Sequence, residues 1–499
     1  MNRILSNALR VFSAFSLSKV LGAVTFLVLP KILGPAGYGV WVTLLLIIYY
    51  SPIFALGTVE ALLREYPYYA GKGDRASARG IEDAVFTSIL AASCFLIVLS
   101  TMICLLVRIE TIGEYREEIN IIAISSALYL ISSFFFHRFA AHQIFNAYSI
   151  VECVRAIAML AAVLSMATLW SIRGAVYGYL LSEVIVCTVS VIASVRLCGS
   201  VNLSADYKQM RRAVKIGLPI TIVWWALTFQ TSVDRIVASY FLGAAATGHY
   251  GLGLSIISAI LIIPQAVNRV LYPRINENVG KQAGREEMAA VIIVPLRMLS
   301  VVLPFLVGLC VLIVPHVYET VFPRYMPGME SAVILLLGVI FIGVTGNGVN
   351  YLIAEDKQYY LLVLVVINIL LNIVLSISLV HVGLSITGIA ISTVITTGML
   401  TMLIWNKVLK TMGYDGNARM KNLSGMLYPI AILVMLMAGA YYFTPSIAYG
   451  TTIRNLVLFV LFYGASVYYM PCHEMRKEVL MNMRAAVNGL IQKNRMHNT

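Results

Sequence analysis

Long apolar stretches recur along this chain and are separated by short polar segments. Taking about 20 apolar residues as one membrane crossing, we count about 14 spans, centred near residues 21, 50, 95, 128, 159, 185, 229, 260, 302, 341, 370, 397, 434 and 461. The longest polar connection has roughly 20 residues, too few for a folded domain outside the membrane. The pattern therefore predicts an all-α integral membrane protein.

The composition agrees with this prediction. Hydrophobic residues make up 60% of the chain and charged residues 12%, against about 45 to 50% and 25% in soluble domains. The mean hydropathy is +0.86. The seven cysteines lie in apolar spans or near predicted cytoplasmic ends, without the spacing of a disulfide framework or a metal site. We therefore expect neither.

The net charge of +13 is distributed unevenly among the polar segments, and this distribution indicates how the chain is oriented in the membrane. With the N-terminus inside, the inner segments hold about 26 of the 36 Lys and Arg residues and the outer ones about 6. Both termini should therefore be cytoplasmic, and no nucleic-acid partner is implied. Arg3 and Arg10 precede an uncleaved first span, because no small-residue cleavage site follows. Residues 472–499 should form a basic amphipathic helix on the anionic inner leaflet.

A short motif occurs twice. Leu33-Gly34-Pro35-Ala36-Gly37-Tyr38-Gly39 follows the first span, and a second copy, from Leu242-Gly243 to Gly248-His249-Tyr250-Gly251, follows the seventh. Six spans separate the copies, so the two halves should share one orientation. Spans 13 and 14 lie outside this repeat.

Charged residues inside the spans are the candidate functional residues, because burying a charge in hydrocarbon costs about 2.5 to 3.5 kcal/mol. Lys19, Arg235 and Arg297 have no carboxylate three or four residues away. Adjacent residues in a helix do not face each other, so Asp234 and Arg235 need separate partners. The three cations should face a central cavity or pair with distant carboxylates.

Other charges have a local explanation. Glu60 can pair with Arg64, and Glu152 with Arg155, at helical spacing. Arg155 nevertheless remains a candidate for substrate binding, and so does Arg269, which could instead reach the lipid headgroups. Glu183 and Asp234 are lone carboxylates, suited either to coupling with an ion or to neutralising a cation.

No catalytic or nucleotide-binding motif is present. The chain has no phosphate-binding loop, HExxH, GxSxG or dinucleotide fingerprint. We therefore expect a protein that is not an enzyme and has no cofactor. Energy would come from H⁺ or Na⁺ coupling, the membrane potential or consumption of the product.

The two motif copies, the Asp234-Arg235 pair before the second, about 14 spans and the cationic inner loops together resemble bacterial oligosaccharide flippases of the Wzx type. These are grouped with the lipid II flippase and the multidrug and toxin extruders in the MOP superfamily. The resemblance implies two six-helix lobes in a V around a central cavity, with cations that hold the diphosphate of a polyprenyl-linked glycan. It covers essentially the whole chain.

Applied to this sequence, the resemblance implies an N-terminal lobe at residues 1–200, a second lobe at 213–412 and extra helices within 422–471. The family pattern at the second motif copy matches Asp234 and Arg235. From their own positions in the spans, we expect Lys19, Arg297, Arg155 and Arg269 to bind the substrate together with Arg235, and Asp234 and Glu183 to be coupling groups or counter-charges. The protein would work in the bacterial inner membrane, for O-antigen, capsule or exopolysaccharide. Its partners would be membrane lipids, a polymerase and glycosyltransferases of the same pathway.

Two alternatives remain. An exporter of cationic drugs could have the same fold, but the unpaired cations outnumber the unpaired carboxylates by about three to two, which favours an anionic substrate. A membrane polysaccharide polymerase or ligase is expected to carry a large outer loop, and this sequence has none.

Overall fold

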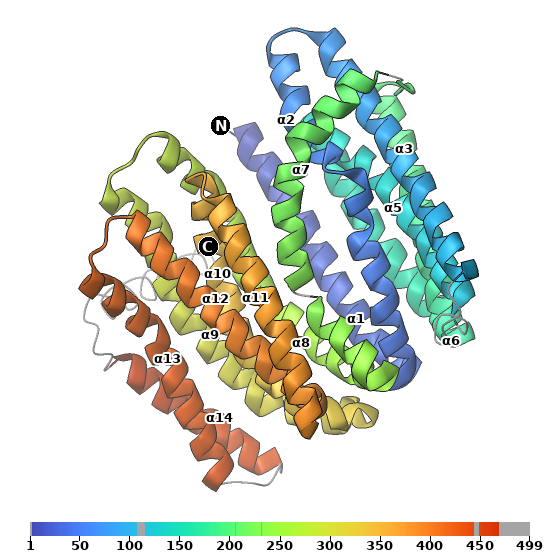
Figure 1. Ribbon diagram of the computed structural model, residues 1–499. Coiled ribbons are helices and arrows are strands. Elements are labelled where there is room, and N and C mark those ends of the chain that lie inside the picture. Colours follow the sequence, from blue (N-terminus) through green and yellow to red (C-terminus); the bar gives the residue numbers. More distant parts are fainter. Residues whose placement is uncertain (1, 107–114, 205, 231, 444–448, 469–499) are drawn as a thin grey trace, which may run out of the picture. The chain divides into compact units, whose positions relative to one another are not determined.

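The computed structural model describes residues 2–106, 115–204, 206–230, 232–443 and 449–468, and its regular elements in these ranges are all helices (Figure 1). The predicted tail at residues 472–499 lies outside the described residues. Ten of the described helices are long and apolar enough to cross a membrane. The chain is therefore an all-α, multi-pass membrane protein.

The chain divides into two compact units, Met1–Ser255 and Ile256–Thr499. The first contains α1 (Asn2–Tyr50), η1 (Ser51–Ala55), α2 (Thr58–Gly71), α3 (Arg75–Leu106), α5 (Arg116–Ala141), α6 (Phe145–Cys198), α7 (Tyr207–Gln230) and the first part of α8 (Val233–Gly280). The second contains the rest of α8, α9 (Arg285–Val321), η2 (Pro323–Gly328), α10 (Met329–Ala354), α11 (Gln358–Leu379), η3 (Val380–Leu384), α12 (Ser385–Thr411), α13 (Gly416–Phe443) and α14 (Tyr449–Tyr468).

Four of the ten candidate spans contain a break in the helical backbone. The breaks lie at Gly34, at Trp170 and Ser171, at Gly243, and between α11 and α12 at Gly383. A straight helix of the length of α6, 54 residues, would extend about 80 Å, well beyond the roughly 30 Å of bilayer hydrocarbon. Each broken candidate is therefore two helical parts joined without a long loop.

The breaks in α1 and α8 have the same local cause. Gly34 has φ 68° and ψ 174°, and Gly243 has φ 81° and ψ −178°. This combination of a positive φ with an extended ψ is accessible essentially only to glycine. The Leu-Gly pair of each motif copy therefore interrupts its helix at the corresponding place.

In the first unit, α6 packs along α1 and α5, and α3 packs on α2 and α5. Its apolar core includes Leu62 of α2, Ile81 and Val85 of α3, and Leu130 and Phe134 of α5. α7 packs against α2 and α3. For this reason α7, which the sequence places in the second lobe, groups with the first unit, and the first part of α8 belongs to the same unit.

In the second unit, α10 packs on α9 and α12, and both α13 and α14 pack on α9. The Trp405 indole is fully buried and donates to the Val344 carbonyl (3.1 Å), which joins α12 to α10. The Asn368 amide of α11 donates to the Thr396 carbonyl of α12 (2.6 Å). Buried polar groups thus hold neighbouring helices together.

Candidate functional site

The two motif copies lie against each other within the first unit. A side chain added at Gly39 would overlap the backbone of Ala244, and one added at Gly248 would overlap the backbone of Pro35. Gly39 lies five residues after Gly34, and Gly248 lies five residues after Gly243. The contact is therefore reciprocal between equivalent positions, and only glycine allows the two backbones to approach so closely.

Polar contacts flank this glycine contact. The fully buried Tyr38 shares a hydrogen bond with Ser255 (2.8 Å between the two oxygens), and the Thr43 hydroxyl lies 3.4 Å from that of Ser239. These pairs join the second part of α1 to α8. They place the beginning of α8, with Asp234 and Arg235, beside the end of α1.

Asp234 and Arg235 contact different groups, as expected for adjacent positions of a helix. Asp234 is 2% exposed and accepts a hydrogen bond from the Tyr250 hydroxyl (2.7 Å), which connects the two parts of α8 across the Gly243 break. Arg235 donates from Nη2 to the Ser232 hydroxyl (3.2 Å), and its guanidinium carbon lies 5.3 Å from the centre of the Tyr49 ring.

The Arg235 side chain is only partly satisfied. Its Nε is buried and has no hydrogen-bond partner among the described residues. Its described contacts are with a hydroxyl and an aromatic ring, and no ion pair to it occurs in the described parts of the chain. A buried donor without an acceptor is unusual in a folded protein. This guanidinium is therefore chemically suited to an anionic ligand.

Arg155 and Glu183 form a second charged cluster, in which Glu183 is 2% exposed. Arg155 donates to Glu183 (3.1 Å) and to the Ser132 hydroxyl (3.1 Å), and its guanidinium carbon lies 5.2 Å from the centre of the Tyr129 ring. Ser132 in turn lies 3.3 Å from Glu183. The cluster thus connects α5 with both parts of α6.

This geometry corrects the partner expected from helical spacing. Glu152 accepts a hydrogen bond from Ser18 of α1 (2.8 Å), while Arg155 pairs with Glu183, 28 residues away in the sequence. Glu183 is therefore not a lone carboxylate. Spacing alone was wrong here because the break at Trp170 and Ser171 separates α6 into two parts, and the second part brings Glu183 to Arg155.

The remaining candidate cations are not brought together by the described contacts. Arg297, on α9 of the second unit, donates to the Asn422 side chain of α13 (3.1 Å). Lys19 lies in α1 and Arg269 in α8, but their side chains are outside the described residues. Convergence of cations from both lobes on one cavity therefore stays a prediction.

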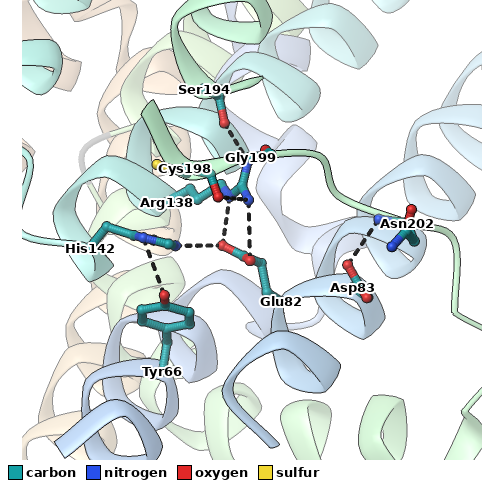
Figure 2. Close-up of polar contacts among 9 residues, drawn as sticks. All are labelled: Tyr66, Glu82, Asp83, Arg138, His142, Ser194, Cys198, Gly199 and Asn202. Carbon is teal, nitrogen blue, oxygen red and sulfur yellow. Dashed lines mark hydrogen bonds and ion pairs between the residues drawn. The ribbon is translucent and has the colours of Figure 1, made fainter. Parts of the chain in front are cut away.

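A third cluster, centred on Arg138 of α5, was not singled out from the sequence (Figure 2). Arg138 is 1% exposed. It donates to both carboxylate oxygens of Glu82 (2.6 and 3.2 Å), to the Ser194 hydroxyl (2.6 Å) and to the carbonyls of Gly199 (3.0 Å) and Cys198 (3.4 Å). All five N–H donors of the guanidinium are thus used.

His142 completes this cluster. Its Nε2 lies 2.8 Å from Glu82, its Nδ1 lies 3.2 Å from the Tyr66 hydroxyl, and the two rings stack with their centres 4.2 Å apart. Burial by itself would lower the pKa of His142, but hydrogen bonds to Cys198 and Glu82 outweigh it and raise the pKa to about 9. The charged imidazole and Arg138 therefore share the Glu82 carboxylate.

The same region fixes the connection between α6 and α7. Besides the Gly199 carbonyl held by Arg138, the backbone N–H of Asn202 donates to Asp83 (2.9 Å) and that of Ser204 donates to the Thr87 hydroxyl (2.9 Å). Arg138 has no carboxylate three or four residues away, and this signal could have identified it. Its full satisfaction indicates a structural role.

Among the residues that the structure describes in the first unit, Arg235 is a buried cation with an unsatisfied donor, and the Arg155 and Arg138 clusters are satisfied internally. A phosphate oxygen could accept hydrogen bonds from the planar guanidinium of Arg235, and such charge-assisted bonds are stronger than those between neutral groups. The described residues contain no group of three or more His, Cys, Asp or Glu side chains able to hold a metal ion.

Comparisons with known proteins agree on the fold. The family described as "Polysaccharide biosynthesis protein" matches residues 4–279. None of the curated proteins matches the sequence. The structure is similar to that of the lipid II flippase MurJ in an inward closed conformation, with a TM-score of 0.70 and 14% identity over 92% of this chain and 98% of that chain.

Two transporter structures are also similar. One is a multidrug resistance MATE family transporter of the MOP superfamily in an inward-facing conformation, with a TM-score of 0.69 and 13% identity over 82% of this chain and 99% of that chain. The other is a mutant of the Vibrio cholerae MATE transporter VcmN, with a TM-score of 0.58 and 14% identity over 83% and 99% of the two chains. At these identities the likeness shows the fold alone.

Proposed function

Because this chain belongs to the polysaccharide biosynthesis protein family, we propose that it is a flippase for a polyprenyl-diphosphate-linked oligosaccharide repeat unit. The family and the fold are those of transporters, so the chain is not an enzyme. The substrate would enter from the cytoplasmic leaflet of the bacterial inner membrane and leave in the outer leaflet. The product would serve O-antigen, capsule or exopolysaccharide synthesis.

Arg235 is the observation that carries this proposal. Its buried Nε lacks a hydrogen-bond partner among the described residues, and its described contacts are the Ser232 hydroxyl and the Tyr49 ring. A cation held in this way is suited to bind the diphosphate of a lipid-linked substrate, because a guanidinium matches phosphate in charge and shape. Lys19, Arg297, Arg155 and Arg269 would contribute further positive charge, and Asp234 would be the coupling group or counter-charge.

The helix breaks support a topology of fourteen spans. Counting each of the four broken candidates twice raises ten to fourteen. We propose two six-helix lobes in a V, at residues 1–200 and 213–412, followed by two helices within 422–471 and a cytoplasmic amphipathic tail at 472–499. The contact of Gly39 and Gly248 with the opposite copy then joins the two lobes, and it would have to separate when the cavity opens on the outside.

Single substitutions of Arg235 test the proposal. We expect Arg235→Ala to lower surface polysaccharide by about tenfold or more, because a hydrogen bond to a charged group contributes about 1.5 to 3 kcal/mol. Arg235→Lys should retain part of the activity, since it keeps the charge but loses the planar fork. Lys19→Ala and Arg297→Ala should also impair export. The measurements are surface polysaccharide and membrane protein level.

Arg274→Ala is the matched control, because Arg274 is an exposed cation on the same helix. Normal polysaccharide from all three alanine variants, at normal protein level, would contradict the proposal. Accumulation of the lipid-linked repeat unit on the cytoplasmic side would show that translocation, and not synthesis, is the step that fails.

The fold shared with the MATE transporter supports a second candidate function, export of small cations. The pairing of Glu183 with Arg155 weakens it, because a cation exporter needs carboxylates available to its substrate. Increased sensitivity of a deletion strain to cationic drugs, with unchanged polysaccharide, would favour export over flipping. A membrane polymerase or ligase would instead make polymer from the repeat unit in vitro.

A further inference from the structure

An apolar groove of about 650 Å³ lies on the first unit, between η1, α3 and α7. It is separate from Arg235 and from the charged clusters described above. The residues that line it are Ile53, Phe54, Ala55, Leu56, Thr58, Ser88, Ala91, Ala92, Phe95, Tyr207, Met210, Arg211, Val214 and Trp225. The volume falls within the range of about 300 to 1,000 Å³ that is usual for ligand sites.

The groove results from small side chains beside a close helix contact. α7 reaches the turn between η1 and α2 at Gly217 and Gly57, where a side chain on either glycine would overlap the other backbone. Farther along, the α3 residues that line the groove between its ends are Ser88, Ala91 and Ala92, and Phe95 lies at the rim. Since the first three side chains are short, the two helices leave a hollow between them.

The groove has the length and polarity of a hydrocarbon chain. It extends along α7 from Tyr207 to Trp225, which corresponds to about 27 Å at 1.5 Å per residue. Phe95 is 56% exposed and Leu56 is 46% exposed, so the rim is apolar too. Such a surface is compatible with lipid chains and not with water.

Positive charge lies at one end only. Arg211 is the single charged residue among those that line the groove. Lys208, Arg212 and Lys215 lie on the same two turns of α7, and Arg212 is occupied by Glu65 (2.8 Å). Basic residues between helices at a membrane surface favour anionic lipid headgroups. An apolar groove that ends at a cation therefore matches one acyl chain and one phosphate.

We propose that this groove binds a single acyl chain of an anionic phospholipid, with the headgroup phosphate held by Arg211. The lipid belongs to the leaflet in which α7 begins, which is the cytoplasmic leaflet in the proposed topology. Bound there, it fills the space between α3 and α7 and ties α7 to the first unit. The proposal does not depend on the identity of the transported substrate.

Photocrosslinking with a diazirine-bearing phosphatidylglycerol tests this site on the purified full-length protein in nanodiscs. We expect crosslinks in the peptides that contain residues 88–95 and 207–225. Ala91→Phe should abolish these crosslinks because the ring fills the groove. Cys94→Phe is the matched control, since Cys94 is also exposed on α3 but does not line the groove.

A second pair of variants tests the headgroup contact without altering the groove. Arg211→Gln should lower crosslinking to the phosphatidylglycerol probe by about fivefold, the usual effect of one basic residue at an anionic surface. It should also remove the preference of the groove for phosphatidylglycerol over phosphatidylcholine. Lys215→Gln, on the same helix but outside the groove, should have little effect. Arg211 is exposed, so its loss should not affect folding.

Three outcomes would overturn the proposal. Equal crosslinking in Ala91→Phe and Cys94→Phe would place the lipid elsewhere, and equal labelling by both headgroups would remove the role of Arg211. Displacement of the probe by polyprenyl phosphate, but not by unlabelled phosphatidylglycerol, would assign the groove to the tail of a polyprenyl lipid. Surface polysaccharide in the Arg235 variants remains an independent measurement, so failure here leaves the flippase proposal untouched.

Discussion

At the residue scale, buried charges differ in how completely their hydrogen bonds are satisfied. Arg138 uses all five of its N–H donors, and Arg155 donates hydrogen bonds to Glu183 and Ser132. Arg235 keeps a buried Nε without a partner among the described residues. Leaving a buried donor unpaired costs about 1 to 3 kcal/mol, and a bound anion would supply the missing acceptor. Arg235 is therefore the cation that we propose to bind a ligand, whereas the hydrogen bonds of Arg138 are satisfied within the protein.

His142 should make the stability of the first unit depend on pH. Its pKa of about 9 in the folded protein lies above the value of about 6.5 for an unperturbed imidazole. The stabilisation is therefore fully present below about pH 6.5 and is lost as the pH rises through 9. At about 1.4 kcal/mol per pKa unit, this stabilisation is at most about 3.5 kcal/mol.

Thermal unfolding of the detergent-solubilised protein between pH 6.5 and 9.5 measures this effect. The melting temperature of the wild type should fall across the range, and His142→Gln should flatten the curve. His381→Gln, an exposed histidine of the second unit, should behave like the wild type. An unchanged slope in His142→Gln would show that the histidine does not carry the stabilisation.

At the scale of elements, a weak sequence repeat becomes a reciprocal contact between α1 and α8. Each copy uses one glycine to break its helix and another, five residues later, to let the opposite backbone approach. Gly34 and Gly39 in α1 correspond in this way to Gly243 and Gly248 in α8. The spacing of the motif is therefore explained by two separate backbone requirements.

Gly39→Ala and Gly248→Ala should have similar effects because their positions are equivalent. We expect each to destabilise the protein by about 1 to 3 kcal/mol, the usual effect of an extra methyl group in a packed site. The double variant should lose less than the sum, since both act on one contact. Thermal unfolding measures this. Gly22→Ala is the control, because a side chain there would meet nothing within 4 Å.

At the scale of the whole molecule, the family likeness identifies the kind of protein, and the division into units shows which helices pack together. The family match identifies a membrane protein of the polysaccharide biosynthesis protein family, and the likeness to MurJ shows its fold. The first unit extends to Ser255, beyond the lobe boundary expected from counting spans, because α7 packs on α2 and α3. The lobes are assigned by counting spans in the order of the chain. The compact units are instead defined by the contacts between helices, so the two boundaries differ.

The proposed topology can be tested by labelling single cysteines in a cysteine-free background. Met326→Cys, in η2, should react with a membrane-impermeant maleimide in intact cells, because it follows an odd number of proposed spans. Asp356→Cys, between α10 and α11, should react only after permeabilisation. Both positions are exposed. The reverse pattern would place both termini outside.

The sequence by itself determined the class of the protein. Apolar stretches of about 20 residues need lipid around them, and the excess of Lys and Arg in alternate loops indicates an orientation. It also identified Arg235 as a cation without a carboxylate three or four residues away, because helical neighbours can be enumerated from spacing. Only the tertiary structure decided which distant groups meet. Arg155 pairs with Glu183 and not with Glu152, and Arg138 with Glu82, because breaks and packing bring together side chains whose separation in sequence carries no signal.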